Sequence, residues 1–531
     1  MPAQVIFSER PGWTAYKHQN LKVFVKGMPK AINPLLDQAI SNPSQKAALL
    51  RALGRIKTHF AVIILGPDFC LACTDLCRSS PLFFSGATVS NDANALRLER
   101  KICKPDPRGV RDAAMSGFVT GSRTLYTNLW QIEAGTCALW TGGKKCPELW
   151  RHSTYQPPTI QNTKHSSLSE KFLAVMDGAI RTGIEEAAGR PVLLALSGGL
   201  DSRLLLAKLV EHGCPNLSAF TYGPRGSDEA KIAKEVAGRL NVPWSPHFTT
   251  PQQMKSFFTT PQLKDYWAFS DGLCSVPNFQ DFLSLKLLQE KKQIPNDTYV
   301  VNGQTGDYIS GGHIPETLMA RSISPNTLLS AIIEKHFSLW QSLKTPNNLN
   351  EIRAELGARF DIDFCKNLSR EEATAIYERF EYEERQAKYV INGQRNYEFL
   401  GLNWLLPFWQ ADVVGFWKEV PLEAKYQQKL YRTTVNNWNY RGIFKDIKTS
   451  VGHWPGMRKL VLGPSRLLRL TFGRPVRDAY LKRMLYFGLY HDQYAPFGLR
   501  SFLRQAKDLR NPVSLLSRAW LASLNMPSAE H

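Results

Sequence analysis

The order of hydrophobic and polar residues divides the chain into a β-rich first part and a second part in which strands and helices alternate. Short apolar or alternating runs at 21–25 and 60–65 predict β-strands within the first 150 residues. In the second part, the pattern predicts helices at 169–188 and 228–240 and strands at 191–196, 217–222 and 297–301. It also predicts a mostly helical region at 325–440. This alternation is typical of a parallel, doubly wound sheet, which binds ligands at the carboxyl ends of its strands. The predicted fold class is therefore α/β.

Four regions follow from the pattern. We predict a β-rich domain at 1–150, a polar linker at 151–168, an α/β domain at 169–450 and a basic helical extension at 451–531. The first residues lack the basic and apolar segments of a signal peptide, and the sequence has no apolar run of about 18 residues. We therefore expect a cytoplasmic protein.

The most informative chemical signal is the turn that follows the strand predicted at 191–196. It reads Ser197-Gly198-Gly199-Leu200-Asp201-Ser202 and leads directly into a helical pattern. Glycines let backbone N–H groups approach an anion, serines add hydroxyl donors, and an aspartate can hold Mg²⁺ on phosphates. The spacing of a Walker loop is absent. The turn therefore predicts a phosphate-binding site of another kind.

Charge and cysteine content narrow the function classes. The chain carries 66 Lys+Arg against 46 Asp+Glu, a net charge of +20, which favours anionic ligands or an anionic membrane. We expect no nucleic-acid partner, because no nucleic-acid-binding motif accompanies this charge. Nine irregularly spaced cysteines indicate a reducing compartment. Cys70, Cys73 and Cys77 have the spacing of a metal cluster, but we interpret them as buried structural thiols.

The α/β region resembles the synthetase domain of the asparagine synthetase family, whose members are N-type ATP pyrophosphatases. Besides the 197–202 turn, the similarity rests on Phe220-Thr221-Tyr222-Gly223, Asn302-Gly303-Gln304-Thr305-Gly306-Asp307-Tyr308, Leu406-Pro407-Phe408-Trp409 and Gln428-Lys429-Leu430-Tyr431-Arg432. The resemblance implies ATP and Mg²⁺ as cofactors. It also implies that a carboxylate is adenylated, with release of pyrophosphate.

The resemblance assigns roles to individual residues. Asp201 and Asp307 would bind Mg²⁺, and both would act in catalysis together with Lys429, which would neutralise charge in the transition state. ATP and its pyrophosphate would contact Leu196, Ser197, Gly198, Gly199, Asp201, Ser202, Tyr222 and Gly303. The alternative for Lys429 is a solvated helix lysine, and His247 would either line the nucleotide site or be structural.

Two positions depart from the synthetase pattern. Gln304 and Tyr308 stand where the family pattern has glutamates, while the aspartate between them survives as Asp307. ATP activation is therefore expected to be intact and the acceptor pocket to be altered.

Residues 1–150 resemble the family's glutaminase domain, an Ntn-hydrolase-like sandwich, through the segments 60–62, 75–84 and 121–135. A working glutaminase needs a cysteine at the mature N-terminus, whose own amine serves as the base. Position 2 is Pro2, and the first cysteine is Cys70. We therefore expect this domain to lack glutaminase activity, with ammonia or another amine as the nitrogen donor.

Family members without a glutaminase nucleophile include enzymes that amidate uronic acids in bacterial surface polysaccharides. They also include cyclases that form amides within one molecule. Residues 311–315 and 397–422 resemble the polysaccharide group more closely. The predicted function is therefore an ATP-dependent ligase that amidates a uronic acid, with a small-molecule or glycan carboxylate as acceptor. A lasso-peptide or β-lactam-type cyclase, an asparagine synthetase and a non-catalytic scaffold are the alternatives.

The predicted extension at 451–531 contains 13 Lys+Arg against 4 Asp+Glu, with apolar residues interleaved. At helical spacing, such segments can lie on an anionic membrane face, which would make the protein peripheral to the inner membrane. The alternative is a helical appendage that packs on the α/β domain with its arginines in water. The sequence pattern leaves both interpretations open.

Overall fold

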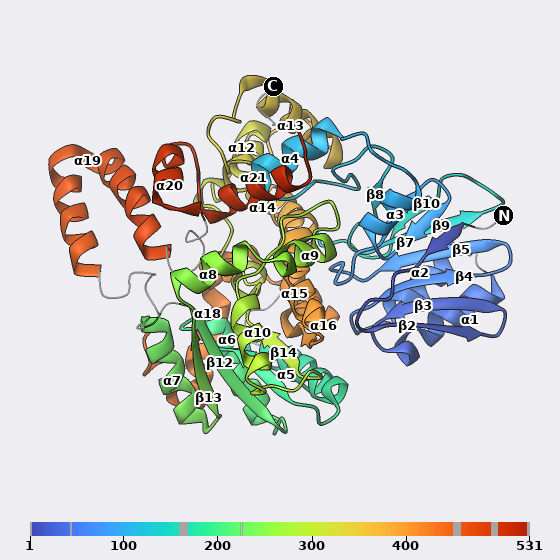
Figure 1. Ribbon diagram of the computed structural model, residues 1–531, viewed down its shortest axis with the longest axis horizontal. Helices are drawn as coiled ribbons and strands as arrows, with labels where there is room; N and C mark the ends of the chain where they lie inside the picture. Colours follow the sequence, from blue (N-terminus) through green and yellow to red (C-terminus); the bar gives the residue numbers. More distant parts are fainter. Residues whose placement is uncertain are drawn as a thin grey trace.

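Residues 3–42, 45–158, 168–223, 225, 227–449, 458–489 and 497–527 are described by the computed structural model (Figure 1). Pro2, residues 159–167 of the predicted linker and residues 451–457 and 490–496 of the predicted extension lie outside the described residues. Figure 1 shows the β-rich part on one side of the molecule and the parallel sheet with its helices beside it. A mostly helical region lies above the sheet, and α19 (Arg458–Leu489) lies at the opposite side from the β-rich part.

The β-rich part contains two sheets. One has six antiparallel strands, in the order β10 (Glu148–Arg151), β9 (Thr136–Thr141), β5 (Phe69–Thr74), β4 (Ala61–Leu65), β3 (Leu21–Lys26) and β2 (Trp13–His18). The other has four strands, in the order β1 (Gln4–Ile6), β7 (Thr88–Ser90), β6 (Phe83–Ser85) and β8 (Trp130–Gln131).

Strand β4 is apolar on both faces because both of its faces are covered. Val62 and Ile64 pack in one core with α1 (Asn33–Ser41) and α2 (Lys46–Gly54). Ala61 and Ile63 pack in a second core with residues of the four-stranded sheet. An unbroken apolar run is the pattern expected of such a strand. The β-rich N-terminal part predicted from the sequence is thus confirmed.

The second sheet-forming part is a five-stranded, wholly parallel sheet. Its strands lie in the order β13 (Trp244–Phe248), β12 (Leu217–Gly223), β11 (Val192–Ala195), β14 (Tyr299–Asn302) and β15 (Asn403–Leu405). The chain adds β12 and β13 on one side of β11 and then β14 and β15 on the other side. The strand order therefore reverses between β11 and β14, and such a switch point opens a crevice at the carboxyl ends of the strands. The predicted doubly wound parallel sheet is confirmed.

The helices around this sheet share one apolar core with its strands. They are α5 (Leu168–Ala187), α6 (Leu200–Glu211), α7 (Asp228–Leu240), α10 (Phe282–Glu290), α16 (Ala411–Glu419) and α18 (Lys429–Trp438). Two of these helices, α5 and α7, agree with their predicted bounds to within one residue.

A second large core is formed almost entirely by helices. Its contributors are α3 (Ala93–Glu99), α4 (Pro107–Ser116), α8 (Pro251–Phe258), α9 (Pro261–Ser270), α12 (Pro325–His336), α13 (Pro346–Arg359), α14 (Arg370–Glu381), α20 (Leu499–Gln505) and α21 (Pro512–Ser523). A nine-residue π-helix, Tyr382–Val390, continues α14 and leads to α15 (Arg395–Phe399). This core joins segments from the predicted β-rich domain, α/β domain and extension, whose boundaries stay predictions.

Helix α21 shows how closely these segments are joined. The Ser517 hydroxyl donates to the Ala113 carbonyl of α4 at 2.7 Å, and Trp520 Nε1 donates to Asp271 at 3.0 Å. The last part of the predicted extension is therefore packed into the molecule, whereas the described side chains of α19 are mostly exposed. Among the described residues, no helix is both long and apolar enough to cross a membrane.

Candidate active site at the switch point

The two aspartates predicted to bind metal lie in equivalent positions, each in the helix that follows one of two neighbouring strands. Asp201 is the second residue of α6, which follows β11, and Asp307 is the second residue of α11 (Gly306–Ile309), which follows β14. Two glycines let the loops touch: a Cβ at Gly303 would lie 2.8 Å from the Ser202 nitrogen, and a Cβ at Gly306 would overlap the Asp201 carboxylate. The structure thus brings Asp201, Asp307 and Gly303 together at the switch point.

The environment of Asp201 disfavours its negative charge. Burial and repulsion from Asp307 raise the pKa of Asp201 to about 7, although a hydrogen bond from the Tyr431 hydroxyl at 2.7 Å opposes this shift. Two facing carboxylates held in this way are hard oxygen ligands that a divalent cation would stabilise. The site therefore fits Mg²⁺, which Asp201 and Asp307 would hold.

Asp307 has a cationic partner that the sequence did not reveal. His313 Nε2 lies 3.0 Å from its carboxylate, and His313 Nδ1 bonds Glu381, which is fully buried at the end of α14. Burial alone would lower the pKa of His313, but these two carboxylates raise it to about 9. The imidazolium in turn keeps the pKa of Asp307 below its usual value, although partial desolvation opposes this shift. His313 lies only six residues after Asp307, yet no spacing rule marks it, because its role depends on Glu381 far along the chain.

The predicted phosphate loop forms a tight turn at the start of α6. The Ser202 hydroxyl accepts from the Ser197 N–H at 3.1 Å and lies 3.0 Å from the Ser197 hydroxyl. Gly199 is the exposed N-cap, so the first N–H groups of the 12-residue helix face outward from the turn. Leu196, just before the turn, is buried and bonded to β12 through Phe220 and Thr221. The turn therefore fits an anion at the helix N-terminus.

A buried arginine fixes this turn, and sequence reasoning assigned it no role. The Arg203 guanidinium is fully buried and donates to the carbonyl oxygens of Gly198, Ile443, Ile447 and Lys448 at 2.8–3.0 Å. It therefore ties the phosphate loop to the segment that follows α18. Because three of these four carbonyls belong to residues 240 or more positions away, nothing in the sequence pattern could identify them.

Lys429 and Tyr222 lie at the edges of the site. Lys429 is the exposed first residue of α18, and its side chain makes no hydrogen bond or ion pair with the described residues. Tyr431, two residues later, donates its hydroxyl to Asp201 at 2.7 Å. Tyr222 lies near the carboxyl end of β12, opposite His247 of the edge strand β13. His247 Nε2 lies 3.0 Å from the Ser245 hydroxyl. The catalytic, nucleotide and structural roles considered for these residues stay predictions.

The two departures from the synthetase pattern differ in their surroundings. Gln304 is partly exposed, and its side-chain oxygen accepts from Gln394 at 3.4 Å. Tyr308 is almost completely buried, donates its hydroxyl to the Glu378 carbonyl at 2.8 Å and packs against Tyr155. Tyr308 thus belongs to the core, while Gln304 lies beside the switch point.

The backbone between Gln304 and Tyr308 is strained at Thr305. Thr305 has φ +83°, which is unusual for a β-branched residue, and its hydroxyl bonds Trp409 at 3.0 Å and Gln386 at 3.2 Å. The loop that carries Asp307 is therefore held by side-chain bonds from two distant elements.

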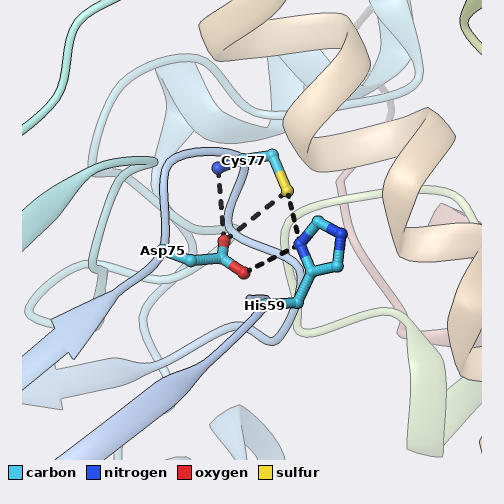
Figure 2. A group of neighbouring side chains, drawn as sticks. All are labelled: His59, Asp75 and Cys77. Carbon is cyan, nitrogen blue, oxygen red and sulfur yellow. Dashed lines mark hydrogen bonds and ion pairs between the residues drawn. The ribbon is translucent and has the colours of Figure 1, made fainter. Parts of the chain in front are cut away.

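The cysteines with metal-like spacing do not converge on one site. Cys70, Cys73 and Cys77 are all buried, as predicted, but Cys73 lies 2.9 Å from Cys137 of the neighbouring strand. Cys77 instead faces Asp75 and His59, with its sulfur 3.6 Å from the carboxylate and 3.7 Å from His59 Nδ1 (Figure 2).

The polar atoms of His59, Asp75 and Cys77 already have hydrogen-bond partners within the protein. Asp75 accepts from the backbone N–H groups of Phe60, Cys77 and Ser79, so its oxygens stabilise the turn after β5. Burial and the nearby Asp75 charge raise the pKa of Cys77 well above its usual value, which keeps the thiol protonated. We therefore interpret the cluster as a structural clamp.

Comparison with known proteins places this geometry in context. The family model for asparagine synthase matches residues 179–446, which is about half of the chain and includes the whole switch point. The search of curated proteins found no match. A solved glutamine phosphoribosylpyrophosphate amidotransferase from B. subtilis, complexed with ADP and GMP, matches with 11% identity and a TM-score of 0.18. The match covers 55% of this chain and 63% of that one.

Proposed function

The chain belongs to the asparagine synthase family, and from this premise we propose that it adenylates a carboxylate at the switch point and then joins it to ammonia or another amine. The family membership supports an ATP-dependent, amide-forming ligase in general. The more specific proposal is that ATP is cleaved to AMP and pyrophosphate and that the acceptor is a uronic acid of a bacterial surface polysaccharide.

The observation that carries the proposal is the pairing of Asp201 with Asp307. Each aspartate lies in the first turn of the helix after one of two adjacent parallel strands, and burial together with the charge of Asp307 raises the pKa of Asp201 to about 7. Such a pair is unfavourable without a cation and suits Mg²⁺ held on a polyphosphate. A purely structural scaffold would have no need of it.

A carboxylate must be activated before an amine can attack it, because oxide and hydroxide are poor leaving groups. A carboxylate oxygen of the acceptor attacks the α-phosphorus of ATP, and the bond to the β-phosphate bridging oxygen breaks to release pyrophosphate. The amine nitrogen then attacks the acyl carbon, the bond to AMP breaks, and the amine loses a proton. When bound, Mg²⁺ would neutralise charge on the phosphates.

Each part of the site would serve one of these steps. The N–H groups at the start of α6 and the hydroxyls of Ser197 and Ser202 would hold the departing pyrophosphate. The exposed ammonium of Lys429 is free to approach the reacting acyl phosphate. His313 would keep the Asp307 carboxylate oriented through its bond at 3.0 Å.

The acceptor requires a cationic environment, and the described residues provide one. Arg385 and Arg432 lie close enough to Asp307 and Asp201 to influence their pKa values, and Lys335 lies 3.7 Å from the buried Glu381. These groups suit a substrate that is itself an anion, such as a uronate.

The test is product analysis with the purified chain, ATP, Mg²⁺ and ammonium. Free and nucleotide-linked uronic acids, aspartate and no acceptor should be compared, with AMP, ADP, pyrophosphate and phosphate all quantified. We expect AMP and pyrophosphate in equal amounts, dependent on a uronic acid. ADP and phosphate as products would contradict the adenylation mechanism, and turnover with aspartate alone would identify an asparagine synthetase instead.

A further inference from the structure

Helix α19 is bent into two limbs that extend away from the rest of the molecule. Gly473 at the bend has φ +81°, a conformation that favours glycine, and Pro475 follows two residues later at the start of the second limb. Figure 1 shows the two limbs at the side of the molecule opposite the β-rich part, with the inner limb next to α20. The bend is therefore a projecting tip.

The tip exposes apolar side chains at a density found nowhere else on the described surface. Leu467, Leu470 and Phe472 are 63%, 84% and 67% exposed, and Val476 is also exposed. The other large exposed apolar residues among those described are single positions on separate segments: Met28, Leu98, Leu149, Phe364 and Leu503. Of these, Leu503 lies on α20, next to α19. Scattered exposed apolar residues are normal, whereas a contiguous group indicates a binding surface.

The apolar tip is flanked by positive charge. Arg466 and Arg469 lie beside Leu467 and Leu470 on the first limb, and Arg474 and Arg477 lie at the start of the second. Between 466 and 477 there is no acidic residue, and Asp478, the first to follow, is paired with Arg477 at 3.7 Å. The tip thus combines exposed apolar side chains with a local charge of one sign.

We propose that this tip, residues 466–477, docks on an anionic lipid bilayer. Leucine and phenylalanine side chains would enter the boundary between headgroups and acyl chains, while the four arginines would contact anionic headgroups. The insertion is shallow, because arginines occur on both limbs next to the apolar residues. The geometry and the net charge of +20 favour lipid over a protein partner, since a narrow, convex tip has little area for a stable protein interface.

The experiment is co-sedimentation of the full chain with vesicles. One set contains phosphatidylcholine alone, and the other contains phosphatidylcholine with about one third phosphatidylglycerol. We expect binding to the anionic vesicles at low salt, at least tenfold weaker binding to the neutral vesicles, and a progressive loss of binding as NaCl is raised, because salt screens the arginines.

Two pairs of variants separate the apolar contribution from the electrostatic one. Leu470→Ser with Phe472→Ser keeps the net charge and should weaken binding about tenfold or more. Its matched control is Leu98→Ser with Leu149→Ser, which removes two exposed apolar residues from α3 and β10. Arg466→Gln with Arg469→Gln should weaken binding to anionic vesicles about tenfold. Its control is Arg51→Gln with Arg55→Gln at the exposed end of α2, with the same change in net charge.

The outcomes decide the proposal. Weaker binding in both tip variants, with both controls like the original chain and with unchanged thermal unfolding, supports it. Equal recovery with neutral and anionic vesicles, absence of binding to both, or equal losses in the tip and control variants overturns it. A concentration-dependent dimer that the Leu470→Ser, Phe472→Ser variant abolishes, without vesicle binding, would identify a second copy of the chain as the partner and would also overturn it.

Discussion

At the scale of single residues, Asp201 is the position where stability and the proposed chemistry conflict. Its pKa in the folded chain, about 7, lies above the ordinary aspartate value of 3.8. The folded state therefore binds the Asp201 proton more tightly than the unfolded state does. The stability that the neutral carboxyl contributes is fully present below pH 3.8 and is lost as the pH rises to about 7. Above that pH, the ionised pair needs a cation.

We therefore expect Asp201→Asn to abolish AMP formation and yet raise the melting temperature. The amide cannot ionise, so without Mg²⁺ at pH 8 the variant should be more stable by an amount on the order of a few kcal/mol. The gain should be smaller at pH 5, where the folded chain is largely protonated at this position. Thermal unfolding at both pH values, with and without Mg²⁺, measures the effect, and Mg²⁺ should stabilise only the original chain.

Asp265→Asn, at an exposed position on α9, is the control for loss of one negative charge. It should leave the melting temperature and the Mg²⁺ response unchanged. An Asp201→Asn variant that is less stable at pH 8, or one that Mg²⁺ still stabilises to the same extent, would contradict the role assigned to this carboxylate.

At the scale of elements, α18 acts on the site through Tyr431, to which the sequence pattern assigned no role. Tyr431 donates to Asp201 at 2.7 Å and so lowers the pKa of that carboxyl. Tyr431→Phe should raise the pKa further, so the acidic limb of the pH profile of kcat/KM for ATP should move to higher pH. At pH 7 we expect a loss of about ten- to a hundredfold, because a hydrogen bond to a charged group contributes roughly 1.5–3 kcal/mol.

Tyr440→Phe is the matched control, since Tyr440 stacks on Trp438 just beyond α18 and makes no contact with Asp201. Its pH profile should match that of the original chain. A Tyr431→Phe variant with reduced activity but an unmoved pH profile would mean that Tyr431 only supports packing.

The elements also show what could be predicted from the sequence and why. Five elements lie close to their predicted positions: helices α5 and α7 and strands β11, β12 and β14. They could be predicted because hydrophobic periodicity is a local property that can be read directly from the sequence. The loop at 197–202 could be predicted for the same reason, since its turn residues, preceding strand and following helix are contiguous.

The rest of the site depends on contacts between distant segments. Arg203 bonds carbonyls some 240 residues away, and His313 depends on Glu381, 68 residues later. The π-helix Tyr382–Val390 has the composition of an ordinary helix, and its extra residue per turn becomes visible only in the structure. Such features have no local signature, so hydrophobic pattern and motif spacing cannot supply them.

At the scale of the whole molecule, α21 closes the helical core. Trp520 is fully buried and bonded to the buried Asp271. Trp520→Ala should lower the free energy of unfolding by about 3–5 kcal/mol, as expected for removal of a buried tryptophan. Denaturant titration of this variant and of Leu470→Ala, at the exposed tip of α19, provides the comparison. A Trp520→Ala chain as stable as Leu470→Ala would contradict a structural role for α21.

The whole chain is expected to take its nitrogen from ammonium and not from glutamine. Every cysteine in residues 3–150 is internal to the chain, so none offers its own α-amine as a base. We expect ammonium to support amide formation by the purified chain, with a rate that rises toward alkaline pH because only neutral NH₃ attacks. Glutamine should not replace it. Release of glutamate from glutamine at the rate of amide formation would contradict this expectation.

The bond between α4 and α21 has a consequence for biosynthesis. The carbonyl of Ala113 and the hydroxyl of Ser517 are 404 residues apart. At synthesis rates of about 5–20 residues per second, α21 leaves the ribosome roughly 20–80 s after α4. During that interval the apolar face of α4 cannot be covered by its native partner, while the strands β2 to β5, which pair with near neighbours, are free to form. The helical core is therefore a late-folding unit that needs protection from aggregation until translation has passed Trp520.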